Sequence, residues 1–424
     1  MSLCLFSVKA AVELTGGAYP PVEIEAASST GLNNVWVVYS VKGMKATYKA
    51  NSPTARVVWM KYSSMGGGYA EEITKGIERN GSDVTLTSLE SNMGYIVEED
   101  NRRYCFWVAD YSLSPFRAES IEVAAMGCET AELAVKGTGA RMDYYSVTGR
   151  SVEIDRAITV AYRTLEYSSD NSRWEQVETV EQFSYLHDRL TVISPLCDTR
   201  FTLSGDRFLT AWGLSESVES ASANATAVAA QESATQNRRE SDNEQSTGND
   251  DLGGSAPAEI EFAAEVTDAA IFTEWQIASD PEFNLITIRV NDPVMTYTFH
   301  DSGTTYVRFE CANADGSCSY TGQTYRVNIG DSDIKCPNAF SPGASEGVND
   351  EWRVSYKSII SFDCHIFNRQ GKQMAHLTDP SQGWNGKSGG KLVPPGVYYY
   401  VITAKGADGR DYKLSGDINI VGFK

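Results

Sequence analysis

Few side chains in this sequence have the type and spacing that catalysis or metal binding requires. Histidine occurs four times, at His187, His300, His365 and His376, and no pair has the spacing of a metal-ligand motif. Neither an H-E-x-x-H pattern nor a phosphate-binding loop is present. Runs of acids such as residues 98–100 are typical of solvated loops, and only a carboxylate pair of the glycosidase kind stays open as an alternative. We therefore predict no enzyme, no catalytic residue, no metal site and no cofactor.

The eight cysteines contain no C-x-x-C pair, which argues against zinc ribbons and thioredoxin-like redox chemistry. In an exported protein, their spacing predicts three disulfides, namely Cys128–Cys197, Cys311–Cys318 and Cys336–Cys364. Cys4 apart, seven cysteines remain, and we expect Cys105 to be the unpaired one. The alternative interpretation is that these cysteines are small buried hydrophobic side chains.

The net charge of the chain argues against anionic binding partners. Acidic residues outnumber basic ones 56 to 36, which gives a formal charge of −20 without a basic run to offset it locally. Such a surface repels phosphate backbones and anionic lipid, so we predict no nucleic-acid partner. No internal segment reaches the roughly 18 apolar residues of a transmembrane helix.

The elements that carry these side chains are predicted to be β-strands. The chain contains 22 Tyr, 15 Phe and 8 Trp, many of them beside Val, Ile or Thr, which is the composition of β-sheets. Short apolar runs such as 35–41 and 103–111 are separated by turn residues, and residues 158–167 alternate between apolar and polar. The sequence therefore predicts an all-β chain of tandem Ig-like β-sandwiches. Trp59, followed later in the chain by the neighbouring residues Tyr104 and Cys105, resembles the core of an immunoglobulin-like domain without its disulfide.

Shifts in composition suggest the domain boundaries. Residues 1–20 are interpreted as a signal-peptide remnant and leader, with a buried N-terminal strand as the alternative. Residues 214–256 contain no Phe, Tyr, Trp or Ile and carry eight acidic against two basic residues, so we predict a disordered acidic linker, with a helix at 221–236 as a minor alternative. The predicted domains are an Ig-like sandwich at 21–119, a second sandwich at 120–213, a third at 257–330 and a small C-terminal sandwich at 331–424.

Two of these segments resemble known families. Residues 257–330 combine Trp275 with a Tyr-Thr-Phe strand and an Asn-Ala-Asp-Gly hairpin, and they resemble the PKD-type Ig-like domain of cell-surface proteins. The C-terminal segment contains four blocks in order: CPNAFSPGASEGVNDEW (336–352), HIFNRQGKQM (365–374), GWNGKSGGKLVPPGVYYYVI (383–402) and YKLSGDINIV (412–421). This ordered set closely resembles the gliding-motility-associated C-terminal domain, which is the type B sorting domain of the type IX secretion system of Bacteroidota.

The resemblance identifies a set of motif residues, which are Pro337, Asn338, Phe340, Pro342, Gly347, Asn349, Asp350, Phe367, Asn368, Arg369, Gly371, Trp384, Gly386, Gly396, Tyr398, Tyr399, Tyr400 and Gly416. Gln370 and Asn385 depart from the family pattern, which has tryptophan and aspartate there. Aromatic and glycine residues in small sandwiches usually serve packing and turns. We therefore expect Phe340, Trp384, Gly386, Gly396, Tyr398 and Tyr400 to hold the fold rather than to contact the secretion machinery.

The resemblance implies that a signal peptide directs the protein across the inner membrane and that the type IX machinery, acting on residues 331–424, exports it. The protein would then be released or held at the cell surface, associated with the outer membrane. We expect the Ig-like domains to adhere to an unidentified surface ligand or protein partner, or to act as spacers. The alternatives are a component of the secretion or gliding apparatus and, less favoured, a surface enzyme acting on glycans.

Overall fold

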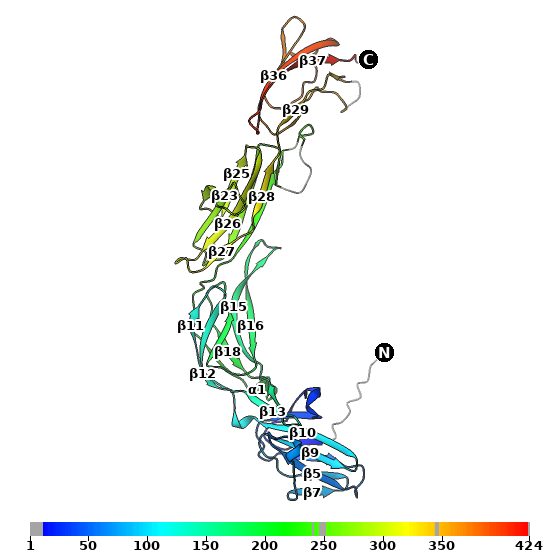
Figure 1. Ribbon diagram of the computed structural model, residues 1–424, viewed down its shortest axis with the longest axis vertical. Coiled ribbons are helices and arrows are strands. Elements are labelled where there is room, and N and C mark those ends of the chain that lie inside the picture. The colour runs from blue at the N-terminus through cyan, green and yellow to red at the C-terminus, as the bar shows by residue number, and fades with distance from the viewer. Residues whose placement is uncertain (1–11, 240, 246–251, 344–346, 423–424) are drawn as a thin grey trace. The chain divides into compact units, whose positions relative to one another are not determined.

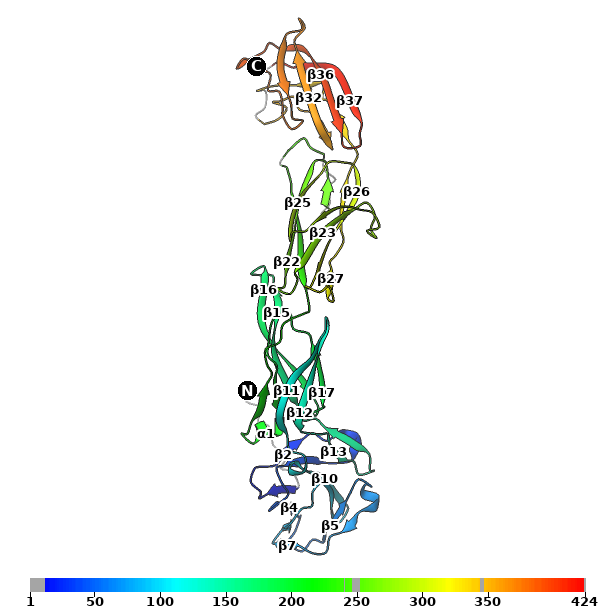
Figure 2. The ribbon, with the colours of Figure 1, turned by 90° about the vertical axis from the view of Figure 1, so that its left-hand side faces the viewer.

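The computed structural model describes residues 12–239, 241–245, 252–343 and 347–422. Nearly all of its regular structure is β-sheet folded into sandwiches, which confirms the predicted all-β class (Figures 1 and 2). The chain forms two compact units, one of Met1–Glu166 with Glu175–Thr226 and one of Tyr167–Trp174 with Ala227–Lys424. In the described part of the chain, no helix is long and apolar enough to cross a membrane.

The first sandwich packs a four-stranded sheet against a six-stranded sheet. The four-stranded sheet has the order β1 (Val12–Thr15), β4 (Lys45–Lys49), β8 (Asp83–Leu86) and β7 (Ile77–Asn80). The six-stranded sheet has the order β2 (Val22–Ile24), β3 (Asn34–Val38), β10 (Arg102–Asp110), β9 (Met93–Glu99), β5 (Val57–Tyr62) and β6 (Glu71–Glu72). Short 3₁₀ turns at Ser28–Thr30, Gly67–Tyr69 and Tyr111–Leu113 lie between strands of this region.

The inner strands of the six-stranded sheet are buried on both faces. Trp36 and Phe106 belong to the core shared with the four-stranded sheet, whereas Val37 and Trp107 belong to the core that continues into the second sandwich. A strand covered on both sides has a nearly continuous apolar sequence instead of an alternating one. This burial explains the unbroken apolar runs of β3 and β10, which are parallel neighbours in the sheet.

The prediction that residues 1–20 are a signal-peptide remnant and leader is partly wrong. Residues 1–11 lie outside the described residues, but β1 pairs with β4 over its whole length, and Val12 and Leu14 are buried. The alternation of apolar and polar residues in VELT suits a strand with one covered face. The buried N-terminal strand, which was the alternative interpretation, is therefore present from Val12 onward.

The second sandwich contains two main sheets and a hairpin. One sheet has the order β11 (Arg117–Met126), β12 (Thr130–Thr138) and β17 (Arg189–Ile193), and the other has the order β16 (Arg173–Phe183), β15 (Ile158–Ser168), β18 (Thr202–Gly205) and β19 (Glu216–Glu219). The hairpin is formed by β13 (Met142–Tyr145) and β14 (Ser151–Ile154), and the helix α1 (Arg207–Ala211) follows β18.

A fully buried ion pair lies in this sandwich, and sequence reasoning did not find it. The side chains of Arg156 and Asp206 are both completely buried, and Arg156 Nε donates to Asp206 Oδ2 at 2.8 Å. Arg156 Nη1 donates to the Ala140 carbonyl oxygen at 2.8 Å. The other carboxylate oxygen of Asp206 accepts the backbone N–H groups of Phe208 and Leu209, so Asp206 is also the N-cap of α1.

The predicted disordered linker at 214–256 is wrong over most of its described length. Residues Glu216–Glu219 form β19, and the eight residues of β20 (Ala230–Asn237) pair without a break along β22 (Ala258–Val266). Further on, the Gln245 N–H donates to the Tyr356 carbonyl oxygen. Residues 240 and 246–251 lie outside the described residues. A strand at a sheet edge is held largely by ladder hydrogen bonds and buries one face only, so it can form from Ala, Ser, Thr and Gln without large apolar side chains.

The third sandwich has an Ig-like fold, as predicted, and its relation to the PKD type stays a prediction. One sheet has the order β20, β22 and β25 (Val294–Phe299). The other has the order β21 (Leu252–Gly254), β28 (Tyr325–Ile329), β26 (Gly303–Ala312), β23 (Phe272–Ala278) and β24 (Ile286–Val290), and β27 (Ser319–Thr321) also pairs with β26. Trp275 is fully buried at its centre, against Phe262 and Phe309.

The C-terminal domain is built on one five-stranded sheet, part of which is labelled in Figures 1 and 2. Its order is β30 (Ala339–Phe340), β37 (Asp411–Ile420), β36 (Gly396–Gly406), β32 (Ile359–Phe367) and β33 (Gln373–Leu377). Two small two-stranded sheets accompany it, β29 (Asp333–Lys335) with β31 (Ser355–Lys357) and β34 (Lys387–Ser388) with β35 (Lys391–Leu392). Alternate residues of β32 and β36 enter the core, so the intervening residues form an outward face.

Candidate functional site

The motif residues of the first C-terminal block hold a loop against the sheet. Phe340 is buried in β30 and packs against the ring of Trp384. The Asn338 carbonyl oxygen accepts hydrogen bonds from the backbone N–H and the side-chain amide of Asn419. Asp350 accepts the N–H of Gly343 on one oxygen and that of Gly347 on the other, at 2.8 and 2.7 Å. Its carboxylate therefore closes the loop, whose residues 344–346 lie outside the described residues.

The second block forms the turn between β32 and β33. Asn368 Oδ1 accepts the backbone N–H groups of Gln370 and Lys372, at 3.0 and 2.9 Å. Gly371 has a φ of 80°, a conformation that glycine adopts without strain. Arg369 and Gln370 are exposed at the tip of the turn. Asn368 and Gly371 thus shape the hairpin, while the two tip residues face solvent.

The aromatic residues of the last blocks pack together under the sheet. Trp384 forms two backbone hydrogen bonds with Trp352, each 2.9 Å, and its ring contacts Tyr398. The Tyr398 hydroxyl donates to the Pro394 carbonyl oxygen at 2.8 Å, and Tyr400 packs on Trp352. A side chain at Gly416 would collide with the Tyr400 ring, since a Cβ there would lie 2.7 Å from the hydroxyl. All of these contacts lie within the C-terminal domain.

The outward face of the same sheet carries a different set of side chains. Val397, Tyr399 and Val401 alternate along β36 and are 44%, 43% and 46% exposed. On the neighbouring strand, Asp363 and His365 point to the same side as Val401 and Thr403, with which they pair. Of the motif residues, Tyr399 is the one that belongs to this apolar stripe.

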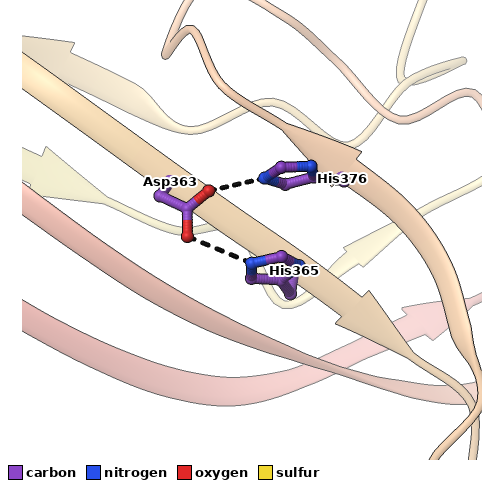
Figure 3. A group of neighbouring side chains, drawn as sticks. All are labelled: Asp363, His365 and His376. Carbon is purple, nitrogen blue, oxygen red and sulfur yellow. Dashed lines mark hydrogen bonds and ion pairs between the residues drawn. The ribbon is translucent and has the colours of Figure 1, made fainter.

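A cluster of Asp363, His365 and His376 lies at one side of this face (Figure 3). His365 and His376 are directly opposite each other in the β32–β33 ladder, and their rings stack with centroids 4.2 Å apart. Each directs Nε2 at a different oxygen of Asp363, at 3.0 Å for His365 and 2.5 Å for His376. The hydrogen bond from His376, opposed by some loss of solvation and aided by the charge of His365, lowers the pKa of the Asp363 carboxyl.

Sequence reasoning missed this cluster because it compared histidine spacings with known linear motifs. The two histidines meet through the register of a hairpin, which a motif search along the chain does not consider. The D-x-H pattern of β32, followed by a histidine in the next strand, was the available signal. His187 and His300, the other two histidines, are exposed and belong to no such cluster among the described residues.

Two G-x-S-x-G sequences, at 343–347 and 386–390, also escaped the sequence analysis. In hydrolases this pattern forms a sharp turn between a strand and a helix, which exposes the nucleophilic serine. Here the first lies between β30 and β31, with its serine outside the described residues, and the second spans the hairpin of β34 and β35. The described elements that follow are strands, so neither segment has the structural context of a nucleophile.

The three predicted disulfides are wrong. Cys128 and Cys318 are each disulfide-bonded, but not to their predicted partners. Cys311, Cys336 and Cys364 have free thiols, and so does Cys105, as predicted. Burial raises the pKa of the Cys311 thiol to about 11 and that of Cys364 to about 12. Spacing along the chain failed because a disulfide requires two Cβ atoms about 4 Å apart, and the fold decides which cysteines meet that condition.

Two segments of the chain match models of known protein families. Residues 334–420 match the model of the CHU_C type IX secretion signal domain, which confirms the predicted family of the C-terminal segment. Residues 121–220 match a fibronectin type III domain, which covers the second sandwich. No curated protein matches the chain.

Among solved structures, a tetra-tandem repeat from the extending region of a large adhesion protein is 13% identical, covering 91% of this chain and 97% of that one, with a TM-score of 0.24. The FN1–FN3 domains of chicken CNTN1 are 11% identical, covering 73% of this chain and 100% of that one, with a TM-score of 0.25. Dimeric latent PorU from Porphyromonas gingivalis is 11% identical, covering 75% of this chain and 35% of that one, with a TM-score of 0.15. The two matched family models, and not these structures, identify the chain as an exported modular protein of fibronectin type III-like and Ig-like sandwiches that carries a type IX secretion signal domain.

Proposed function

We propose that this chain is a cell-surface or secreted protein of a Bacteroidota-type bacterium, in which the upstream sandwiches adhere to a partner or act as spacers. The match of residues 334–420 to a type IX secretion signal domain is the observation that carries the proposal. The C-terminal domain is held by its own core, which includes Phe340, Trp352 and Trp384. Such a domain can act as a folded export tag for what precedes it.

The adhesive or spacer role is supported by the kind of domain that precedes the tag. The largest buried side chains, among them Trp59, Trp107 and Trp275, lie in the hydrophobic cores of the sandwiches. The matched domain kinds are non-catalytic ones. Function in such folds resides in exposed loops and faces and not in the core.

The test is fractionation of a type IX-competent host that expresses the intact chain, a chain without residues 331–424, and residues 331–424 fused to a foreign soluble domain with a signal peptide. We expect the intact chain and the fusion at the surface or in the medium, and the truncated chain in the periplasm. Because Asn243 donates to the carbonyl oxygens of Val354 and Pro380, a second fusion that begins at residue 241 keeps this contact. Export of the truncated chain as efficient as that of the intact one would refute the sorting role.

A control for folding is needed because a truncated chain can be retained merely as a misfolded protein. Circular dichroism and protease resistance of the retained chain should show folded sandwiches. Deletion of the gene should leave other exported proteins unaffected. If other proteins are stranded in the periplasm instead, the chain is a component of the apparatus and not its cargo.

A further inference from the structure

The cluster of Asp363, His365 and His376 brings three metal-ligating groups to one spot on the outward face of the C-terminal sheet (Figure 3). Asp363 and His365 are two residues apart on β32 and therefore share a face. His376 is the ladder partner of His365 on β33. One atom from each of the three residues lies within 4.8 Å of the other two.

The hydrogen-bond partners of His365 leave a place for a cation. Its Nδ1 lies 3.2 Å from Gln373 Oε1, and its Nε2 lies 3.0 Å from Asp363 Oδ2. Both partners are acceptors, whereas a neutral imidazole donates from only one of its two nitrogens. If Gln373 orients the ring through Nδ1–H, then Nε2 presents a lone pair toward a carboxylate. Three arrangements resolve the conflict: a proton on the ring, a rotated Gln373 amide that donates to Nδ1, or a metal ion between Nε2 and the carboxylate.

The geometry points to a metal ion, and we propose that Asp363, His365 and His376 form a binding site for a divalent transition-metal ion of the Cu²⁺, Ni²⁺ or Zn²⁺ class. Two imidazoles and one carboxylate suit these ions, whereas Mg²⁺ and Ca²⁺ prefer sites made of oxygen ligands alone. Gln373 is then the outer partner that orients His365, a role commonly filled by an acceptor on the second ring nitrogen.

The three side chains can close on an ion without disturbing the core. Bonds of about 2.0–2.1 Å place two ligand atoms of a tetrahedral ion about 3.4 Å apart. The two Nε2 atoms therefore have to move back from the Asp363 oxygens, which now lie at 3.0 and 2.5 Å, and the stacked rings have to turn. The side chains of His365, His376 and Asp363 are 34%, 41% and 46% exposed, which leaves room for rotation and for water at the remaining positions. The strand beneath them is anchored by Cys364 and Ile366, both fully buried.

The test is a titration of the full chain, made without a polyhistidine tag, with CuCl₂ and separately with ZnCl₂, followed by calorimetry. We expect one ion per chain at this site, and at least a tenfold weaker affinity in His376→Ala and in Asp363→Asn. His187→Ala and His300→Ala are matched controls, because each removes an exposed histidine outside the cluster, and they should bind as the parent does. Equal affinity in the parent and in His376→Ala would overturn the proposal, as would the absence of binding.

A second measurement does not depend on the variants. Electron paramagnetic resonance of the copper-loaded parent should show coupling to two imidazole nitrogens, and His365→Gln should reduce it to one. The same spectrum in the parent and in His365→Gln would place the ion elsewhere. The metal should also raise the melting temperature of the unit that contains β32 and β33, since a ligand of the native state stabilises it by mass action. A cluster that is only an ion pair with protonated histidine would show none of these effects.

Discussion

Removal of the charge of Asp206 should destabilise the first unit strongly, because it leaves the guanidinium of Arg156 as an unpaired charge in the core. Both side chains are 0% exposed, and Arg156 Nη2 lies 2.7 Å from Asp206 Oδ2 without the alignment of a hydrogen bond. Breaking such a pair by removing one partner destabilises a protein by about 3–5 kcal/mol. In Asp206→Asn the side-chain oxygen is retained and can still accept the N–H groups of Phe208 and Leu209, so the loss is electrostatic and not one of capping.

The assay is differential scanning calorimetry of the full chain, in which the two compact units can unfold separately. For a unit of this size, 1 kcal/mol corresponds to about 2–4 °C, so Asp206→Asn should lower its melting temperature by about 6–20 °C. The transition of the second unit should not move.

Two further variants separate the charge from other causes. Arg156→Met combined with Asp206→Asn leaves no buried charge, so its destabilisation should fall short of the sum of the single variants by at least about 2 kcal/mol. Glu132→Gln is the matched control, because Glu132 pairs with Arg189 at 2.9 Å on the surface, with side chains 49% and 68% exposed. Its effect should stay below about 1 kcal/mol. Additive single variants, or an Asp206→Asn protein as stable as the Glu132→Gln protein, would refute the reasoning.

Three other predictions concern packing, thiols and pH. Gly386→Ala should destabilise the second unit by about 1–3 kcal/mol in calorimetry, because φ is 72° and the added Cβ would lie 3.1 Å from Pro342 Cγ. In the control Gly422→Ala the added Cβ meets no atom within 4 Å, so the stability should not change. In native reduced protein at pH 8, iodoacetamide should label the half-buried Cys336 faster than the fully buried Cys364, because burial raises the pKa of the Cys364 thiol to about 12. Equal labelling rates of the two thiols, measured by mass spectrometry, would contradict this prediction. Burial, followed by the nearby Asp206 carboxylate, raises the pKa of Tyr111 to about 12, so its contribution to stability is complete below about pH 10 and is lost as the pH rises toward 12. Between pH 10 and pH 12, the melting temperature of Tyr111→Phe should therefore fall less than that of the parent. An equal fall in the two proteins would argue against this reasoning.

The errors in the sequence analysis have a common origin. Residues 230–237 have no aromatic or Ile side chain and were predicted to be disordered, yet they form an edge strand on β22. Composition measures how much apolar surface a segment can bury, but an edge strand depends mainly on the ladder that its neighbour offers. In the same way, cysteine spacing suggested closed loops within domains, and the fold instead leaves Cys336 and Cys364 as thiols.

The motif residues show how much a family resemblance can supply. The blocks around Phe340, Asn368, Trp384 and Gly396 predicted the C-terminal domain, and the comparison confirms its family. The structure then adds what each residue contacts, for example the turn that Asn368 closes and the ring of Trp384 against Phe340. Whether any of them contacts the secretion machinery stays a prediction.

The sequence alone determined the all-β class, the positions of some of the sandwich strands and the sorting domain. These properties depend on local patterns, which are alternation with period two, turn residues and ordered motif blocks. Only the tertiary structure decided that Arg156 meets Asp206 across 50 residues, that His365 meets His376 beside Asp363, and that the linker supplies strands. Such encounters depend on strand order and register, because a side chain's neighbours in a sheet come from distant parts of the chain and a shift of one residue would turn every one of them to the opposite face.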